Sequence, residues 1–121
     1  MGKNRRLEQI NLSIVGIIII ILVLLHSIYL LVSEKKQILG LDSLTNEEFV
    51  TQALGNRIIS FVVVLLFFSF ALENYNNVED KTNNDLLRLL VSTFSLIAIL
   101  IELYLTIKNY IAVKEEENNS N

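Results

Sequence analysis

The segment from Leu89 to Ile107 runs for nineteen residues with a single formal charge, the carboxylate of Glu102. At a rise of about 1.5 Å per residue, a helix of this length crosses the ~30 Å hydrocarbon core of a bilayer. A charged side chain inside that core costs on the order of 2.5–3.5 kcal/mol on insertion scales, which is a reason for it to have a partner. We therefore predict a membrane helix over about 86–109 that turns Glu102 toward protein.

The polar and small residues of this helix fall on one face. Steps of three and four residues separate them, and this spacing places residues on one stripe of a helix. The stripe consists of Arg88, Ser92, Ser95, Glu102, Thr106 and Asn109, with Ile99 completing the series and Ala98 at its border. The far side is expected to hold Leu89, Leu96, Ile97, Leu100, Tyr104 and Ile107. A membrane helix with one polar face turns that face toward protein, so we predict that the stripe is a helix-packing surface.

Two further apolar segments precede this helix. The first, about 10–33, has an apolar run from Leu12 to Val32 that is too long for the ~7–15-residue core of a signal peptide. The second, about 56–73, is shorter, and it spans a bilayer if the side chain of Arg57 extends to the interface. The fold class we predict is an all-α integral membrane protein, in which residues 1–121 form one domain with three transmembrane helices.

The residues between the first two segments contain a helix-start signal. Thr45 and Glu48 have the spacing of a capping box, and Gly55 is placed like a C-terminal stop. We predict a short amphipathic helix over about 45–54 that lies at the membrane interface. After the third segment, the acidic and asparagine-rich residues 114–121 predict a disordered tail.

Composition excludes several classes of function. Hydrophobic residues make up 52% of the chain and are gathered in blocks, so no separate globular domain is expected. The net charge of −3 offers no basic face for nucleic acid. The chain has no cysteine, one histidine, and neither a phosphate-binding loop nor a nucleophile motif, so we expect no enzyme, no cofactor and no metal site. Frequent asparagine, isoleucine and lysine are typical of an AT-rich genome and favour a bacterial source.

Four polar residues are expected at a similar depth. His26 and Glu102 each lie about four residues from the middle of their segments toward the same side, roughly 6 Å from the midplane. Arg57 and Ser60, on the antiparallel second helix, fall in the same half. The four side chains predict either a polar clasp that holds the helices together or a site that handles protons or cations. A third possibility is that Glu102 faces another subunit.

These features predict a small multi-pass protein of the cell membrane that is an accessory or assembly subunit of a larger complex. Its expected partners are the lipid bilayer and other membrane subunits or further copies of itself. The alternatives are a homo-oligomeric pore and a proton- or cation-coupled transport component that uses Glu102 and His26. Three helices in about 120 residues resemble the general layout of some phage holins, which would imply a pore, although the acidic tail departs from the basic tail expected of one. Basic residues before the first helix favour a cytoplasmic N-terminus.

Overall fold

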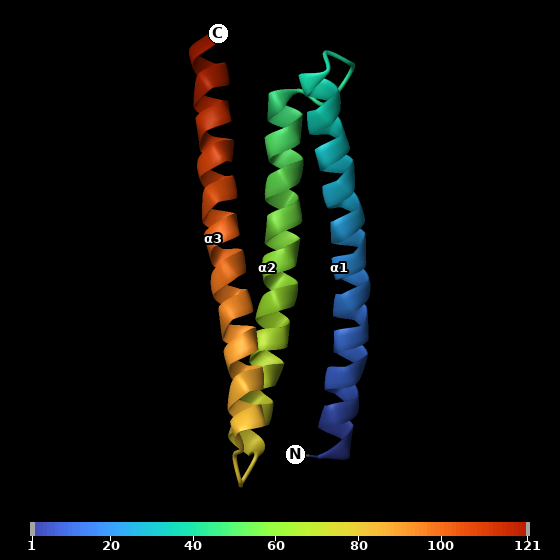
Figure 1. Ribbon diagram of the computed structural model, residues 1–121, viewed down its shortest axis with the longest axis vertical. Coiled ribbons are helices and arrows are strands. Elements are labelled where there is room, and N and C mark those ends of the chain that lie inside the picture. Colours follow the sequence, from blue (N-terminus) through green and yellow to red (C-terminus); the bar gives the residue numbers. More distant parts are fainter. Residues whose placement is uncertain (1, 121) are drawn as a thin grey trace.

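The computed structural model describes residues 2–120, with side chains to residue 119, and consists of three long helices. Helix α1 covers Lys3–Ile38, α2 covers Asn46–Asn77 and α3 covers Asn83–Ser120. They run side by side in alternating directions, and α2 lies between the other two (Figure 1). Close backbone contacts join α1 to α2 and α2 to α3, whereas none joins α1 to α3 over the described residues. The predicted all-α architecture with three long apolar helices is confirmed.

Each of the three helices is long and apolar enough to cross a membrane. Their lengths of 36, 32 and 38 residues exceed the roughly 20 residues that a bilayer core requires, so each helix extends beyond its apolar stretch. Large hydrophobic side chains lie exposed along all three, including Leu31, Val62 and Val91. A soluble bundle of this size does not leave so large and continuous an apolar surface open to water. The outer surface is therefore compatible with lipid.

Helix α1 approaches α2 closely at a glycine. Gly16 is buried, and a Cβ atom added there would come within 2.9 Å of Cζ of Phe67 and 3.3 Å of Cγ1 of Val63. Real Cβ atoms essentially never have neighbours closer than 3.0 Å, so only glycine fits without a shift. Small residues at helix contacts let backbones approach each other and gain dispersion contacts in lipid. Gly16 therefore fixes the α1–α2 packing at this level.

Helix α3 meets α2 through a seven-residue pattern. Half-buried residues of α3 recur at alternating steps of three and four, namely Leu89, Ser92, Leu96, Ile99, Leu103, Thr106, Tyr110 and Val113. This is the spacing by which helices pack in coiled coils. The prediction that Leu89 and Leu96 lie on the far side is wrong, because both are half-buried members of this row. Ile97 and Tyr104 are exposed.

The short interfacial helix predicted over 45–54 is wrong, because these residues form the first turns of α2. The capping box is present. Glu48 N–H donates to Oγ1 of Thr45 at 3.1 Å, and Thr45 N–H donates to the Glu48 carboxylate at 3.4 Å. Gly55 does not stop the helix and continues it within α2, since its φ is not positive. Side chains on both sides of Gly55 bond to α1, as described below, and this offsets the roughly 1 kcal/mol that a helical glycine costs.

The glycine that does end a helix is Gly40, after α1. Its φ is +75°, the left-handed region that favours glycine. Leu41 N–H donates to the carbonyl oxygen of Lys36 at 2.8 Å, and Gly40 N–H donates to that of Gln37 at 3.1 Å. This pair of bonds is a Schellman motif, which satisfies the last carbonyl groups of α1 and turns the chain toward α2.

Helix α3 begins after a second capping arrangement. Asp85 N–H donates to Oγ1 of Thr82 at 3.3 Å, and Thr82 N–H donates to the Asp85 carboxylate at 2.9 Å. At its other end α3 continues to Ser120, so the stretch for which we expected disorder is helical as far as it is described, and residue 121 lies outside the described residues. Lysine and glutamate are good helix formers, and an ion pair described below holds this end to α2.

Candidate functional site

Asn56 organises a hydrogen-bond network between α1 and α2. Asn56 is only 4% exposed. Its side-chain nitrogen Nδ2 lies 3.1 Å from the carbonyl oxygen of Val23 and 3.2 Å from Oγ of Ser27. The same nitrogen lies 3.0 Å from Nδ1 of His26. Its Oδ1 accepts a hydrogen bond from Nη1 of Arg57 at 3.1 Å. Both ends of the buried amide therefore have partners, as a setting of low dielectric requires.

The partners of His26 determine which of its ring nitrogens carries hydrogen. Because Nδ2 of Asn56 is a donor, Nδ1 of His26 acts as the acceptor. His26 Nε2 lies 3.0 Å from Oε1 of Gln52 and therefore donates to it. We assign a neutral imidazole with its hydrogen on Nε2, since this tautomer satisfies both contacts. The ring of Tyr29 stacks on His26 with a centroid separation of 6.0 Å.

An ion pair extends this network to α3. Arg57 Nε lies 3.7 Å from Oε2 of Glu102. The side chain of Glu102 is still 56% exposed, and that of Arg57 is 36% exposed. One chain of polar contacts thus crosses all three helices, through Gln52, His26, Asn56, Arg57 and Glu102. We call this chain the polar relay.

The polar relay includes three of the four residues that the sequence placed at one depth. His26, Arg57 and Glu102 belong to it, whereas Ser60 donates to the carbonyl oxygen of Asn56 in its own helix at 2.9 Å. Sequence reasoning missed Asn56 and Gln52. They are one helical turn apart, and the spacing would have placed them on one face had α2 been predicted to begin at Asn46.

The polar stripe of α3 borders an open groove between α1 and α3. In one half of the bundle, a cavity of about 360 Å³ is lined by Glu102, Thr106 and Asn109 of α3, with Leu30 and Glu34 on the α1 side. Residues of α2 also line this cavity. Glu102 therefore faces a space that all three helices enclose only in part.

Toward the other end of the bundle, the same face of α3 borders a second cavity. This one has a volume of about 580 Å³, and Arg88 and Ser92 line it together with Arg6 of α1. Ser95 and Ala98 lie exposed on α3 between the two cavities. The predicted stripe thus overlaps the half-buried row at Ser92, Ile99 and Thr106. Its members Arg88, Glu102 and Asn109 line the two cavities.

Ion pairs fasten the ends of the helices. Arg5 donates to both carboxylate oxygens of Glu73, at 2.9 and 2.7 Å, and the fully buried Gln9 donates to the same carboxylate at 3.2 Å. At the opposite end, and outside the predicted spanning segments, Lys114 pairs with Glu47. The hydrogen bond from Lys114 lowers the pKa of Glu47, and the same bond raises the pKa of Lys114. Both shifts favour the charged pair that joins α2 to α3.

The polar side chains described above form hydrogen bonds and ion pairs with one another. Among the described residues, no group of three or more His, Cys, Asp or Glu side chains is placed to hold a metal ion. No family model matches this chain, and neither a curated protein nor a solved structure matches it significantly. The site offers a polar relay that connects three helices and a partly open groove at which Glu102 is presented.

Proposed function

We propose that this chain is a multi-pass membrane protein that acts as an accessory or assembly subunit of a larger membrane complex. In this proposal the groove between α1 and α3 receives a transmembrane helix of the partner. The observation that supports it is the exposure of the α3 stripe along that groove, above all the 56% exposure of the Glu102 side chain. Ionisable residues in membrane segments almost always face protein or a water-filled cavity, so lipid is a poor neighbour for this face.

The lining of the groove defines what its occupant must offer. Ser95 and Ala98 lie exposed on α3 between the two cavities without lining either, and their small size lets a second helix approach α3 closely. Glu102 and Asn109 offer polar atoms at two levels, and Phe49 supplies apolar surface from α2. We expect an apolar helix that carries a hydroxyl, amide or basic side chain level with Glu102. We favour this role over proton-coupled transport because Glu102 pairs with Arg57, and both ring nitrogens of His26 are hydrogen-bonded.

A photo-crosslinking amino acid in place of Ala98 tests this proposal. In native membranes it should form a discrete adduct with a membrane-spanning protein, because Ala98 lies between the two cavities of the groove. The same amino acid at Tyr104, which is 64% exposed, should give lipid adducts only. Glu102→Leu should reduce the Ala98 adduct about three- to tenfold, the range expected for losing one polar contact of about 0.6–1.4 kcal/mol.

Tyr104→Leu is the matched control for Glu102→Leu, because it changes an exposed side chain of α3 outside the cavity linings. It should leave the Ala98 adduct unchanged. Equal adducts in wild type, Glu102→Leu and Tyr104→Leu would contradict the docking role. An adduct between two copies of this chain would favour the homo-oligomeric pore instead.

We further propose that the N-terminus lies in the cytoplasm. The support is the basic first turn of α1, with Lys3, Arg5 and Arg6, because positive charge beside the first apolar segment usually sets orientation. Three spanning helices would place the C-terminus on the opposite side. A phosphatase fused after Asn119 should then be active, and a cytoplasmic fluorophore at the same position should be dark. The reverse pattern would invert the orientation.

A further inference from the structure

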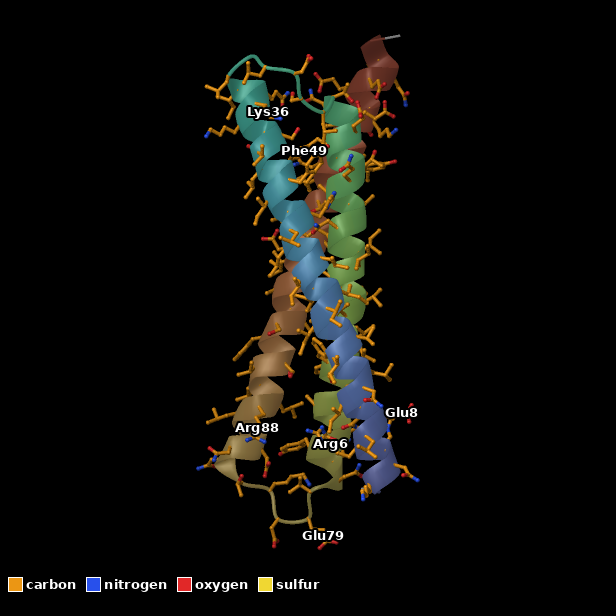
Figure 2. All side chains as sticks on the ribbon, turned by 90° about the vertical axis from the view of Figure 1, so that its right-hand side faces the viewer. Arg6, Glu8, Lys36, Phe49, Glu79 and Arg88 are labelled. Carbon is orange, nitrogen blue, oxygen red and sulfur yellow. The ribbon has the colours of Figure 1, made fainter. Side chains whose placement is uncertain are left out.

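The end of the bundle where α1 begins has a cleft with two arginines. It has a volume of about 580 Å³, and its lining includes Arg6 of α1, Asn74 and Tyr75 of α2, and Arg88 of α3. Arg6 and Arg88 lie at the same end of the bundle, near the connection that carries Glu79 (Figure 2). Two guanidinium groups from helices without close backbone contact thus line one concave surface.

Two carboxylates at this end of the bundle, Glu73 and Asp85, are already engaged. Both oxygens of Glu73 accept hydrogen bonds from Arg5. Asp85 lines the cleft, but its Oδ2 accepts from the N–H and the hydroxyl of Thr82, each at 2.9 Å. These bonds, together with the charge of Arg88, keep Asp85 in a capping role at the start of α3.

Of the two arginines of the cleft, Arg88 attracts the Asp85 carboxylate from beyond ion-pairing distance. Arg6 donates to Oε1 of Gln9 at 3.2 Å, and within residues 2–119 neither Arg6 nor Arg88 forms an ion pair. With Asp85 counted, the formal charge of the lining is +2 − 1 = +1. Arg6 and Arg88 are both exposed, and the parallel N–H groups of a guanidinium fit an anion that accepts two hydrogen bonds.

Asn74 sets a second requirement for a ligand of this cleft. In the part of the chain that the structure describes, Oδ1 of Asn74 is buried and has no hydrogen-bond partner. Buried acceptors are nearly always paired, so an orphan in a cleft lining indicates that a donor belongs there. The cleft therefore suits a ligand that joins an anionic group to a hydrogen-bond donor.

The cleft lies at the depth of lipid headgroups if the helices span a membrane. Arg88 is ten residues from Ala98, the middle of the apolar stretch of α3, which is about 15 Å along a helix. Half of a ~30 Å hydrocarbon core is the same distance. Arg6 precedes the apolar run that begins at Leu12, so it lies on the polar side of the same boundary.

We propose that this cleft binds the headgroup of an anionic glycerophospholipid, with Arg6 and Arg88 at the phosphate and a headgroup hydroxyl donating to Oδ1 of Asn74. The phosphodiester accepts the guanidinium hydrogen bonds, but it has no hydrogen to donate. Phosphatidylglycerol supplies hydroxyls beside its phosphate and thus meets both requirements. The net positive lining also favours an anionic lipid over a zwitterionic one.

Native mass spectrometry of the full chain, released from vesicles with equal phosphatidylglycerol and phosphatidylcholine, tests this site. The wild type should retain one phosphatidylglycerol with at least about tenfold preference. Arg6→Gln combined with Arg88→Gln should remove that preference. Lys3→Gln combined with Lys108→Gln removes the same charge outside the cleft and should leave the preference intact. If both double variants lost the preference for phosphatidylglycerol equally, the preference would reflect surface charge alone, and the proposal would be overturned.

Phosphatidylmethanol isolates the part played by the hydroxyl, because it has the same charge but no headgroup donor. The wild type should prefer phosphatidylglycerol to phosphatidylmethanol, and Asn74→Leu should abolish this preference. No preference in the wild type would overturn the assignment of the hydroxyl to Asn74. Displacement of the lipid by inorganic phosphate alone would assign the cleft to a soluble phosphate and overturn the lipid assignment.

Circular dichroism checks that each variant keeps its helices. If the double glutamine variant does not fold, Arg88→Lys replaces it, since lysine keeps the charge but loses the two-pronged hydrogen bonding. A folded Arg88→Lys variant should retain less phosphatidylglycerol than the wild type. Unchanged retention by that variant would contradict the role of Arg88 in the site.

Discussion

Replacing Gly16 with leucine is expected to separate α1 from α2 and to give the largest loss of stability of any single substitution in the α1–α2 contact. A Cβ atom at this position would already lie 2.9 Å from Cζ of Phe67, and leucine adds three more carbons. Overpacking of a close contact costs about 1–3 kcal/mol, and more where the backbone must move. Reversible unfolding in mixed micelles, followed by circular dichroism, measures the change in the free energy of unfolding.

Gly55→Leu is the matched control, because it places the same side chain at another helical glycine. A Cβ atom at Gly55 would meet no heavy atom within 4 Å. This variant should be neutral or more stable by up to about 1 kcal/mol, since leucine is a better helix former than glycine. Phe67→Ala should recover part of the loss in Gly16→Leu, because the two side chains compete for one space. Equal effects of leucine at the two glycines would contradict the close contact at Gly16.

Asn56→Leu is expected to break the polar relay at its centre. Leucine has a similar size but offers no hydrogen bonds, so Nδ1 of His26 and Nη1 of Arg57 would each lose a partner. A buried polar group left unpaired costs about 1–3 kcal/mol, and because His26 and Arg57 are only partly buried we expect the lower end of this range. The same unfolding assay should show a loss in this range. Crosslinking from position 98 should also fall, because Arg57 would no longer be held against Asn56 while it pairs with Glu102.

Two comparisons make the Asn56→Leu result specific. Ser60→Ala removes a hydroxyl that bonds to a carbonyl of its own helix, so it should change stability by no more than about 0.5 kcal/mol. His26→Leu combined with Asn56→Leu should cost less than the sum of the single variants, because both belong to one network. Strictly additive losses would mean that the contact between His26 and Asn56 contributes nothing.

The sequence predicted the three helices because long apolar runs dominate the energetics of a chain in lipid. The capping box of Thr45 and Glu48 was also predicted, since it depends on residues only three positions apart. Signals of this kind are local. They needed no knowledge of how the helices pack.

The sequence did not predict where α2 begins, because Gly55 lies where a glycine often ends a helix. What keeps the helix continuous is a set of bonds from Gln52 and Asn56 to α1, and these depend on tertiary packing. The segment predicted over about 56–73 excluded Gln52 and placed Asn56 at its very end. Asn56 was therefore not predicted as the centre of the polar relay.

The face of α3 that packs on α2 was predicted only in part. The predicted stripe and the half-buried row share Ser92, Ile99 and Thr106. Elsewhere the row lies one residue further on, with Leu89, Leu96, Leu103 and Tyr110 in place of Arg88, Ser95, Glu102 and Asn109. Which row packs on α2 depends on the shape of α2, and a single sequence does not contain that information directly. The same limit applies to the pairing of Arg5 with Glu73, whose 68-residue separation becomes contact only through the register of α1 on α2.

The lack of close contact between α1 and α3 has a consequence for biosynthesis. Every contact of α1 with α2 described above, from the Arg5–Glu73 pair to the bonds of Asn56, involves residues made before α3 leaves the ribosome. The α1–α2 hairpin can therefore reach its final packing first, in line with the stepwise assembly of membrane helices. If the helices span a membrane, α3 is inserted last, against an α1–α2 hairpin that is already packed, and the face that carries Glu102 becomes available only then.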